Sequence, residues 1–262
     1  MKIIISTIIE IGALYALFLL FVYFFAEKII FPAPEPSYGD NGEFDFIEFD
    51  CDGKQRVAVL YLPAKDSEYT LIYSHGNGED LGEIRPVLEN LRASGLSVIA
   101  YDYVGYGLSK GKPTVKNLLA AADAVWKYAV EDRKIPPDKI ALMGYSLGSA
   151  PTSHLAAAHD GQIRAVVLSG AFSHGVNAII PVNIVPWKIL DNASLLKGVK
   201  TPIMLIHGKK DRIVPFRNFK ELSATCAAGT KKIIQPEFGH TNISQSPDYF
   251  RIISNFVKNP KQ

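Results

Sequence analysis

The chain opens with a long apolar run. Residues 3–26 are apolar except for Ser6, Thr7 and Glu10. As a helix this run would extend about 36 Å, and the hydrocarbon core of a bilayer is about 30 Å thick. The pattern therefore predicts an N-terminal membrane anchor over residues 1–30, which contacts a lipid bilayer through residues 3–26.

A cleaved signal peptide is the alternative interpretation of this run. The run is longer than an ordinary signal core, and Phe24-Phe25-Ala26 offers no small-x-small cleavage site, which favours a retained single-pass anchor. Lys2 precedes the run, and Glu27 and Lys28 follow it. Because these flanking charges are balanced, the side of the membrane that holds the rest of the chain stays open.

Prolines then interrupt the pattern. Pro32, Pro34 and Pro36 exclude a helix and predict a stiff, extended tether over residues 31–42. The remaining residues, 43–262, are enough for one substantial core, so we expect a single domain after the tether.

Apolar and polar residues alternate where that domain begins. Segments 43–49 and 56–62 lie on either side of Asp52-Gly53 and predict an antiparallel hairpin. After the hairpin the apolar runs are short and mostly unalternated, as in strands that are covered on both faces. These runs are 70–73, 97–101, 139–143, 165–168, 203–206 and 232–234.

Longer stretches of helical character separate most of these runs. Because strand and helix alternate, the chain predicts an α/β fold with a mostly parallel, doubly wound sheet. An insertion follows the sixth strand, and we expect it to form a short cap, at about residues 171–195, over the carboxyl edge of the sheet. The predicted helices are 81–94, 115–130, 147–158, 216–226 and 249–257.

Two stretches of the domain have the pattern Gly-x-Ser-x-Gly. In residues 144–148 the pattern follows an apolar run and opens an Ala-rich stretch, and this order of strand, sharp turn and helix exposes a nucleophilic serine, Ser146. In residues 107–111 the pattern continues into Lys112-Pro113, which indicates a loop around Ser109. The context favours Ser146 as a nucleophile.

A serine nucleophile needs an imidazole base and a carboxylate that orients the imidazole. Asp211 and His240 each follow a predicted strand, and the chain order Ser146, Asp211, His240 is typical of serines on turns of this kind. Asp191 is the reserve candidate for the acid. His174, in the insertion, is the rival candidate for the base.

Acyl transfer also needs N–H donors for the oxyanion that develops on the carbonyl. The amide of Leu147, next to the serine, supplies one donor. The amide of Asn77, in the glycine-rich loop after the run 70–73, is the best candidate for the second. An ordinary glycine-rich turn is the alternative interpretation of residues 74–78.

Charge and cysteine content argue against several other classes of protein. The formal net charge is +2 and Lys and Arg are scattered along the chain, so no nucleic-acid footprint is indicated. Cys51 and Cys226 are too far apart to suggest a zinc site or a disulfide framework. No metal and no cofactor is implied, because a hydroxyl, an imidazole and a carboxylate suffice for this chemistry.

Five motifs occur together in this chain. They are Ser74-His75-Gly76-Asn77, residues 101–109, Gly144-Tyr145-Ser146-Leu147-Gly148, residues 207–211 and Gly239-His240. Together they resemble the α/β-hydrolase superfamily and, more narrowly, the group of α/β-hydrolase-domain-containing protein 17, a set of palmitoyl-protein thioesterases. The resemblance implies that Ser146 is the nucleophile, His240 the general base and Asp211 the orienting acid, with Asn77 and Leu147 forming the oxyanion hole.

The sequence therefore predicts a membrane-anchored serine hydrolase that cleaves an ester or thioester, with an apolar acyl group under residues 178–187 of the insertion. The thioesterases that it resembles are tethered by a cysteine-rich, acylated N-terminus, whereas this chain has no cysteine before Cys51. For this reason protein depalmitoylation is not carried over to this chain from the resemblance. A peptidase or amidase of the same fold and a non-catalytic membrane-tethered scaffold stay open as alternatives. The pattern indicates neither the substrate itself nor the oligomeric state.

Overall fold

The computed structural model describes residues 2–175 and 189–260. The chain divides into two compact parts, Met1–Pro32 and Ala33–Gln262. The domain boundaries expected from the sequence, with an anchor over 1–30, a tether over 31–42 and a domain from 43 onward, stay predictions.

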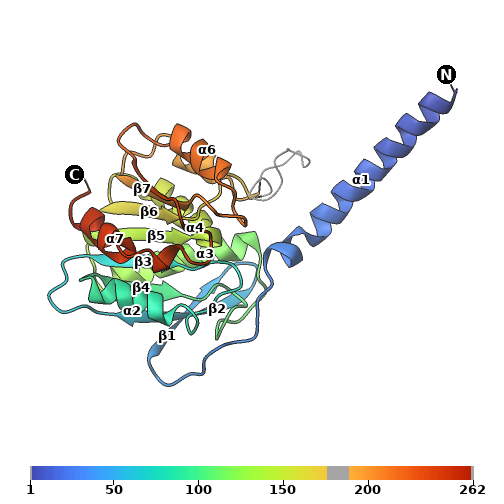
Figure 1. Cartoon of the computed structure of the whole chain (residues 1–262). Coiled ribbons are helices and arrows are strands. Elements are labelled where there is room, and N and C mark those ends of the chain that lie inside the picture. Colours follow the sequence, from blue (N-terminus) through green and yellow to red (C-terminus); the bar gives the residue numbers. More distant parts are fainter. Residues whose placement is uncertain (1, 176–188, 261–262) are drawn as a thin grey trace. The chain divides into compact units, whose positions relative to one another are not determined.

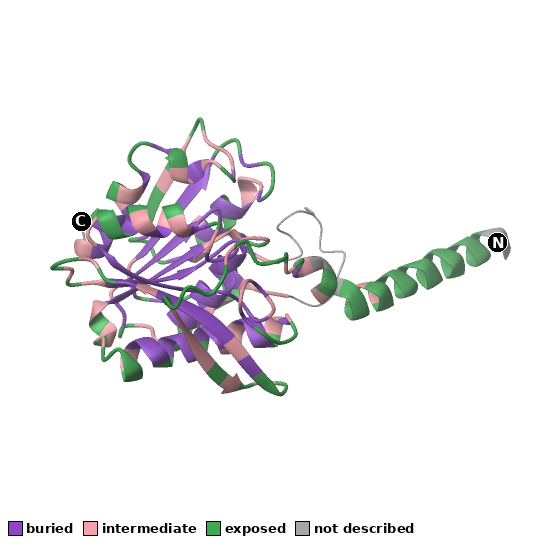
Figure 2. Cartoon of the chain, turned by 90° about the horizontal axis from the view of Figure 1, so that it is seen from below, coloured by how far each residue is buried: buried purple, intermediate pink, exposed green. Residues whose placement is uncertain are grey.

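The first part contains the helix α1, Lys2–Ile30. Within it, Ile4–Phe25 is a stretch of 22 residues with a mean hydropathy of 2.3, long and apolar enough to cross a membrane. The described side chains of this stretch are mostly exposed (Figure 2). Length and composition make α1 a candidate anchor, and a signal sequence near the N-terminus has the same properties.

The second part is built on an eight-stranded sheet with the order β1-β2-β4-β3-β5-β6-β7-β8 (Figure 1). The predicted hairpin is present, with β1 (Phe44–Asp50) antiparallel to β2 (Lys54–Leu62). β2 is also antiparallel to β4, and every pair from β4 to β8 is parallel. The remaining strands are β3 (Thr70–Ser74), β4 (Ser97–Tyr101), β5 (Ile140–Tyr145), β6 (Ala165–Ser169), β7 (Ile203–Gly208) and β8 (Lys231–Gln235).

Helices cover both faces of the sheet (Figure 1). α2 (Arg85–Ala93) and α7 (Tyr249–Lys258) share one apolar cluster with the strands, whereas α3 (Val115–Lys127) and α4 (Ser149–Ala158) pack on the other face. Every residue of β3, β4, β6 and β7 is buried (Figure 2), which explains why these strands are unalternated apolar runs. The predicted α/β fold with a mostly parallel, doubly wound sheet is confirmed.

Two helix boundaries differ from the prediction by more than two residues. The helix expected from residue 81 begins at Arg85, because Pro86 suits only a first turn and the preceding residues form turns around Asp80, whose carboxylate accepts the N–H of Glu83 at 3.0 Å. The helix expected to end at residue 130 is α-helical to Lys127 and continues as a single π-helical stretch, Tyr128–Asp132.

The second half of the predicted tether is bound to the domain. The backbone N–H of Ser37 donates to the carboxylate of Asp80 at 2.6 Å, and the hydroxyl of Tyr38 donates to the carboxylate of Asp102. Prolines keep the segment extended, but they leave the side chains after them free to find polar partners. The sequence pattern showed the first property and not the second.

Part of the predicted cap, residues 176–188 with the apolar pieces at 178–187, lies outside the described residues. The ends of the insertion meet in a short antiparallel bridge between His174 and Asp191. α5 (Asn192–Leu196), which the sequence did not predict, follows directly and packs against α4 and α6 (Arg217–Thr225).

Candidate active site

Ser146 stands on a tight turn at the carboxyl end of β5. The strand ends at Tyr145, a 3₁₀ turn covers Ser146–Gly148, and α4 begins at the next residue. The φ angle of Ser146 is +51°, a left-handed conformation that is strained for a residue with a side chain. Strain of this kind persists only where the surrounding structure enforces it, and it is frequent at functional sites.

The two glycines of the motif make this turn sterically feasible. A Cβ atom on Gly144 would lie 2.3 Å from the carbonyl oxygen of Gly148, and a Cβ atom on Gly148 would lie 2.0 Å from the carbonyl oxygen of Ser74. Both distances are far inside van der Waals contact. The strand, the turn and the neighbouring strand β3 can approach this closely only without side chains at both positions.

The turn has a further support that the sequence did not reveal. The hydroxyl of Ser149 donates to the carbonyl oxygen of Ser146 at 2.6 Å, and the side-chain amide of Asn192 donates to the hydroxyl of Ser149 at 2.9 Å. Asn192 is the first residue of α5. A helix of five residues is too short to produce a recognisable period, so no signal in the sequence marked this contact.

The structure brings the three predicted side chains together. Nε2 of His240 lies 2.8 Å from Oγ of Ser146, and Nδ1 of His240 lies 2.6 Å from Oδ2 of Asp211. Their loops follow β5, β7 and β8, so all three lie at the carboxyl edge of the sheet. A carboxylate can only accept, so Nδ1 carries the proton, and the lone pair of Nε2 faces the serine hydroxyl.

Asp211 and His240 are held firmly and are nearly closed to solvent, with exposed fractions of 6% and 7%. The other oxygen of Asp211 accepts the backbone N–H groups of Ile213 and Val214 at 2.9 and 2.8 Å. The hydroxyl of Tyr145 donates to the carbonyl oxygen of His240 at 3.0 Å. These contacts fix the carboxylate and the backbone that carries the imidazole.

A second imidazole lies behind Asp211. Nε2 of His207 is 2.9 Å from the carbonyl oxygen of Val214 and 3.5 Å from Oδ2 of Asp211. Burial lowers the pKa of His207 despite this hydrogen bond and the nearby carboxylate. The imidazole of His207 is therefore neutral at pH 7 and acts as a hydrogen-bonding support.

The glycine-rich loop after β3 lies beside these residues. The hydroxyl of Tyr106 donates to the side-chain oxygen of Asn77 at 2.8 Å. The N–H of Gly76 donates to the carboxylate of Glu79 at 2.7 Å. The roles of the Asn77 and Leu147 amides as oxyanion donors stay a prediction.

Glu79 is a residue of this region that sequence reasoning missed. Its carboxylate contacts the backbone of Gly76, and a Cβ atom on Gly76 would lie 2.5 Å from the carboxylate and 2.9 Å from the ring of Tyr145. Burial raises the pKa of Glu79, although the hydrogen bond from Gly76 and the charge of His240 act in the opposite direction. The sequence offered one sign of this role, an acidic residue directly after a glycine-rich loop. An ordinary exposed acid in a loop gives the same sign.

The rival candidates lie elsewhere. The hydroxyl of Ser109 donates to the carbonyl oxygen of Asp102 at 3.0 Å and accepts the N–H of Ala58 at 2.9 Å, so this buried serine links β2 to the residue that follows β4. Nδ1 of His174 lies 2.7 Å from Oδ1 of Asp191, which also caps α5 by accepting the N–H of Ser194 at 3.0 Å. Asp191, the reserve candidate for the acid, and His174, the rival candidate for the general base, are therefore paired with each other where the insertion begins and ends.

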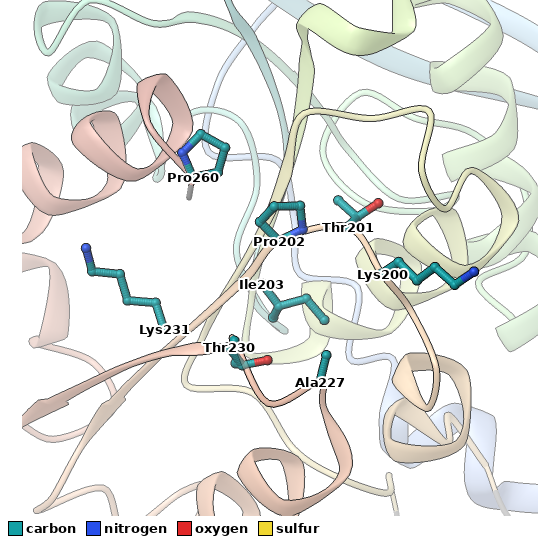
Figure 3. A pocket seen from close by; sticks show the side chains of 9 residues that line it. Lys200, Thr201, Pro202, Ile203, Ala227, Thr230, Lys231 and Pro260 are labelled. Carbon is teal, nitrogen blue, oxygen red and sulfur yellow. The ribbon is translucent and has the colours of Figure 1, made fainter. Parts of the chain in front are cut away.

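A pocket of about 600 Å³ lies at the opposite edge of the sheet (Figure 3). Its lining includes Ile203 and Lys231, the first residues of β7 and β8, whereas Ser146, Asp211 and His240 follow the ends of strands. Lys200 and Lys231 extend in different directions from this pocket (Figure 3). It has no part in the candidate active site.

A parallel sheet with an antiparallel hairpin at one edge, and with Ser, His and Asp joined at its carboxyl edge, defines the class of protein. The chain has the α/β-hydrolase fold, and its sequence is similar to that of proteins of the α/β-hydrolase superfamily. A family model described as serine aminopeptidase, S33, matches residues 65–192, which include Asn77 and Ser146.

Two relatives show which α/β hydrolase domain-containing proteins the chain is similar to. The chain is 30% identical over 208 residues to α/β hydrolase domain-containing protein aho-3 of Caenorhabditis elegans, and the match covers 78% of this chain and 62% of that protein. It is 28% identical over 206 residues to α/β hydrolase domain-containing protein 17B of Homo sapiens, with 77% of this chain and 71% of that protein covered. The chain therefore spans less than two thirds of the length of aho-3.

Solved structures show the same fold. Esterase Pf2001 of Pyrococcus furiosus has a TM-score of 0.69 and 18% identity, over 86% of this chain and 98% of that one. Est1E of Butyrivibrio proteoclasticus, with ferulic acid bound, has a TM-score of 0.63 and 19% identity, over 81% and 96%. At these identities the likeness concerns the fold alone.

Proposed function

We propose that this chain is a membrane-anchored serine hydrolase that cleaves an ester or thioester through an acyl-enzyme on Ser146. The observation that carries the proposal is the hydrogen-bonded series from Ser146 through His240 to Asp211. A hydroxyl is a weak nucleophile at neutral pH, and an imidazole with its lone pair at 2.8 Å can take the proton as the oxygen attacks.

In the first half of the reaction, Oγ of Ser146 bonds to the carbonyl carbon of the substrate while Nε2 of His240 takes the hydroxyl proton. The carboxylate of Asp211 stabilises the imidazolium that forms. The amides of Leu147 and Asn77 donate to the oxyanion, and each such donor is worth about 3 to 4 kcal/mol in the transition state. The leaving alcohol or thiol then takes the proton from His240, and the acyl group stays on Ser146.

In the second half, a water molecule takes the place of the leaving group. His240 removes one of its protons as the water oxygen attacks the acyl carbon, and returns that proton to Oγ of Ser146 as the carboxylic acid leaves. Serine, imidazole and carboxylate are thereby restored, and no group outside these residues and water is consumed.

An ester or thioester is the substrate class that we favour. One solved structure of similar fold, Pf2001, is an esterase, and an apolar helix near the N-terminus suits an enzyme whose acyl substrate is dissolved in the bilayer. The description of the matching family model, a serine aminopeptidase, favours amide cleavage as the second candidate. The same three side chains serve both reactions, so only substrates can separate them.

The proposal is tested on the full-length chain with a fluorophosphonate probe and a substrate panel. We expect the probe to label the wild type and the Ser109→Ala variant, but not Ser146→Ala. The panel contains p-nitrophenyl esters and acyl thioesters of rising chain length, beside aminoacyl p-nitroanilides. Preference for long acyl chains supports the proposal, whereas preference for the anilides supports the aminopeptidase. Absence of labelling in folded wild-type protein would instead support a binding scaffold.

The anchor is tested separately. We expect the full-length chain to stay in the membrane pellet after alkaline carbonate extraction and to keep its N-terminus intact by mass spectrometry. Release into the supernatant, or a mature N-terminus beyond residue 26, would contradict a retained anchor and favour the signal peptide.

A further inference from the structure

The segment that follows the apolar helix in sequence is hydrogen-bonded to the loop that carries Asn77. The N–H of Ser37 donates to Oδ2 of Asp80 at 2.6 Å, and its hydroxyl donates to Oδ1 of the same carboxylate. Asp80 is 1% exposed, and it also accepts the N–H of Glu83 at 3.0 Å. Burial alone would raise the pKa of Asp80, but the hydrogen bonds from Ser37 and from neighbouring backbone N–H groups lower it.

Tyr38 makes a second connection to the end of the same loop. Its hydroxyl donates to Oδ2 of Asp102, and the other oxygen of Asp102 accepts the N–H of Leu81 at 2.9 Å. The ring of Tyr38 packs on Phe44 with the ring centroids 4.7 Å apart. A Cβ atom on Gly82 would lie 2.4 Å from Oγ of Ser37 and 2.9 Å from Cβ of Tyr38, so backbone and segment are in direct contact there.

A third connection reaches Asn77 itself. The hydroxyl of Tyr106 donates to the side-chain oxygen of Asn77 at 2.8 Å, and the backbone of Ala33 hydrogen-bonds to the same hydroxyl. Residues 33–38, which we call the strap, therefore contact Asp80 directly and reach Leu81 through Asp102 and Asn77 through Tyr106.

We propose that the strap positions residues 76–81 as an oxyanion loop and that the rate of hydrolysis depends on it. The loop contains Gly76 and Gly78, and Gly78 has a φ of +78°, so its own sequence leaves it conformationally free. A donor stabilises an oxyanion only where its direction is fixed before the reaction begins. The strap supplies that restraint from outside the loop. This inference rests on the proposed function, because the loop donates to an oxyanion only in a hydrolase.

The test uses Ser37→Ala, Tyr38→Phe and the double variant in the full-length chain. Tyr38→Phe keeps the ring on Phe44 and removes only the hydroxyl. Tyr128→Phe is the matched control, because the Tyr128 hydroxyl also donates to a carboxylate, that of Asp45 at 2.5 Å, but belongs to neither strap nor loop.

We expect the double variant to lose about 10-fold to 100-fold in kcat with KM nearly unchanged, since the strap acts on the transition state. Amide hydrogen exchange of residues 76–82 should become faster in this variant and stay unchanged in Tyr128→Phe. A kcat equal to that of Tyr128→Phe, or unchanged exchange at 76–82, would overturn the proposal. If the double variant does not fold, the two single variants are judged by the same criteria.

The exchange measurement separates this inference from the proposed function. If Ser146→Ala hydrolyses the substrates as fast as the wild type, the proposed function fails. Faster exchange at 76–82 in the strap variants would still show that the strap holds the loop, and unchanged exchange would refute the strap whatever the catalytic result.

Discussion

The two Gly-x-Ser-x-Gly loops of this molecule have the same pattern and opposite geometries. In residues 144–148 the serine has the positive φ angle, +51° at Ser146, and its hydroxyl faces His240. In residues 107–111 the glycines have the positive φ angles, +47° at Gly107 and +125° at Gly111, and the hydroxyl of Ser109 is buried between strands. Which residue of the motif takes the left-handed conformation decides whether the serine is presented or enclosed.

The glycines of the two loops also serve different contacts. Those at 144 and 148 admit backbone carbonyl groups at 2.3 and 2.0 Å from a hypothetical Cβ atom. Those at 107 and 111 admit the side chains of Asp102 and Gln55 at 1.8 and 1.9 Å. A motif match therefore specifies close packing around a serine, and the neighbours determine what that packing is for.

Replacing each serine tests the comparison most directly. We expect Ser146→Ala to lose about 10⁶-fold in turnover if the three side chains act as a unit. The measurement is the hydrolysis of the best ester of the panel, with the thermal unfolding midpoint as a check of folding. Turnover within tenfold of the wild type in a folded variant would contradict the role of Ser146.

The next largest effect concerns the acid. Asp211→Asn should lower kcat by about 10⁴-fold, because the amide favours the wrong imidazole tautomer. Asp191→Asn is the matched control, since asparagine is as good an N-cap as aspartate, and we expect less than about a threefold change. If the two variants lose similar activity, the acid has been assigned to the wrong residue.

Ser109→Ala should affect stability and leave turnover per folded molecule unchanged. The change leaves the N–H of Ala58 without its acceptor inside the protein, at a cost of about 1 to 3 kcal/mol. Urea unfolding measures this loss. A Ser109→Ala variant that is as stable as the wild type but hydrolyses more slowly would reverse the contrast between the two loops.

The smallest effect concerns Glu79, beside the Ser146 loop. Its raised pKa means that the folded state holds this proton more tightly than the unfolded chain, so its contribution to stability is lost as pH rises above about 4.5. Glutamine keeps an acceptor for Gly76 and cannot ionise. We expect the stability of Glu79→Gln to fall less than that of the wild type between about pH 4 and pH 8. The stabilities of both proteins are measured by urea unfolding at each pH. If the two curves of stability against pH are parallel, the pKa of Glu79 is the same in the folded and the unfolded state.

Much of the fold could be predicted because local patterns of apolar and polar residues indicate its strands and helices. The buried strands β3 to β7 are apolar on both faces, and helices alternate with them, so the parallel sheet followed from the period alone. Ser146 was chosen over Ser109 from its position between a strand and an Ala-rich helix. Helix boundaries were less accurate, since the start of α2 at Arg85 depends on turns around Asp80.

The sequence alone determined an apolar N-terminal helix, an α/β sheet, and three candidate side chains placed after strands that end at one edge. Only the tertiary structure decided that His240 faces Ser146, that His174 and Asp191 pair with each other, and that Ser37 and Tyr38 bind the loop of Asn77. The physical reason is the separation along the chain of the residues that interact. Periodicity and turn chemistry act between neighbours in the chain, whereas these contacts join residues separated by up to 94 positions and form only once the core has packed.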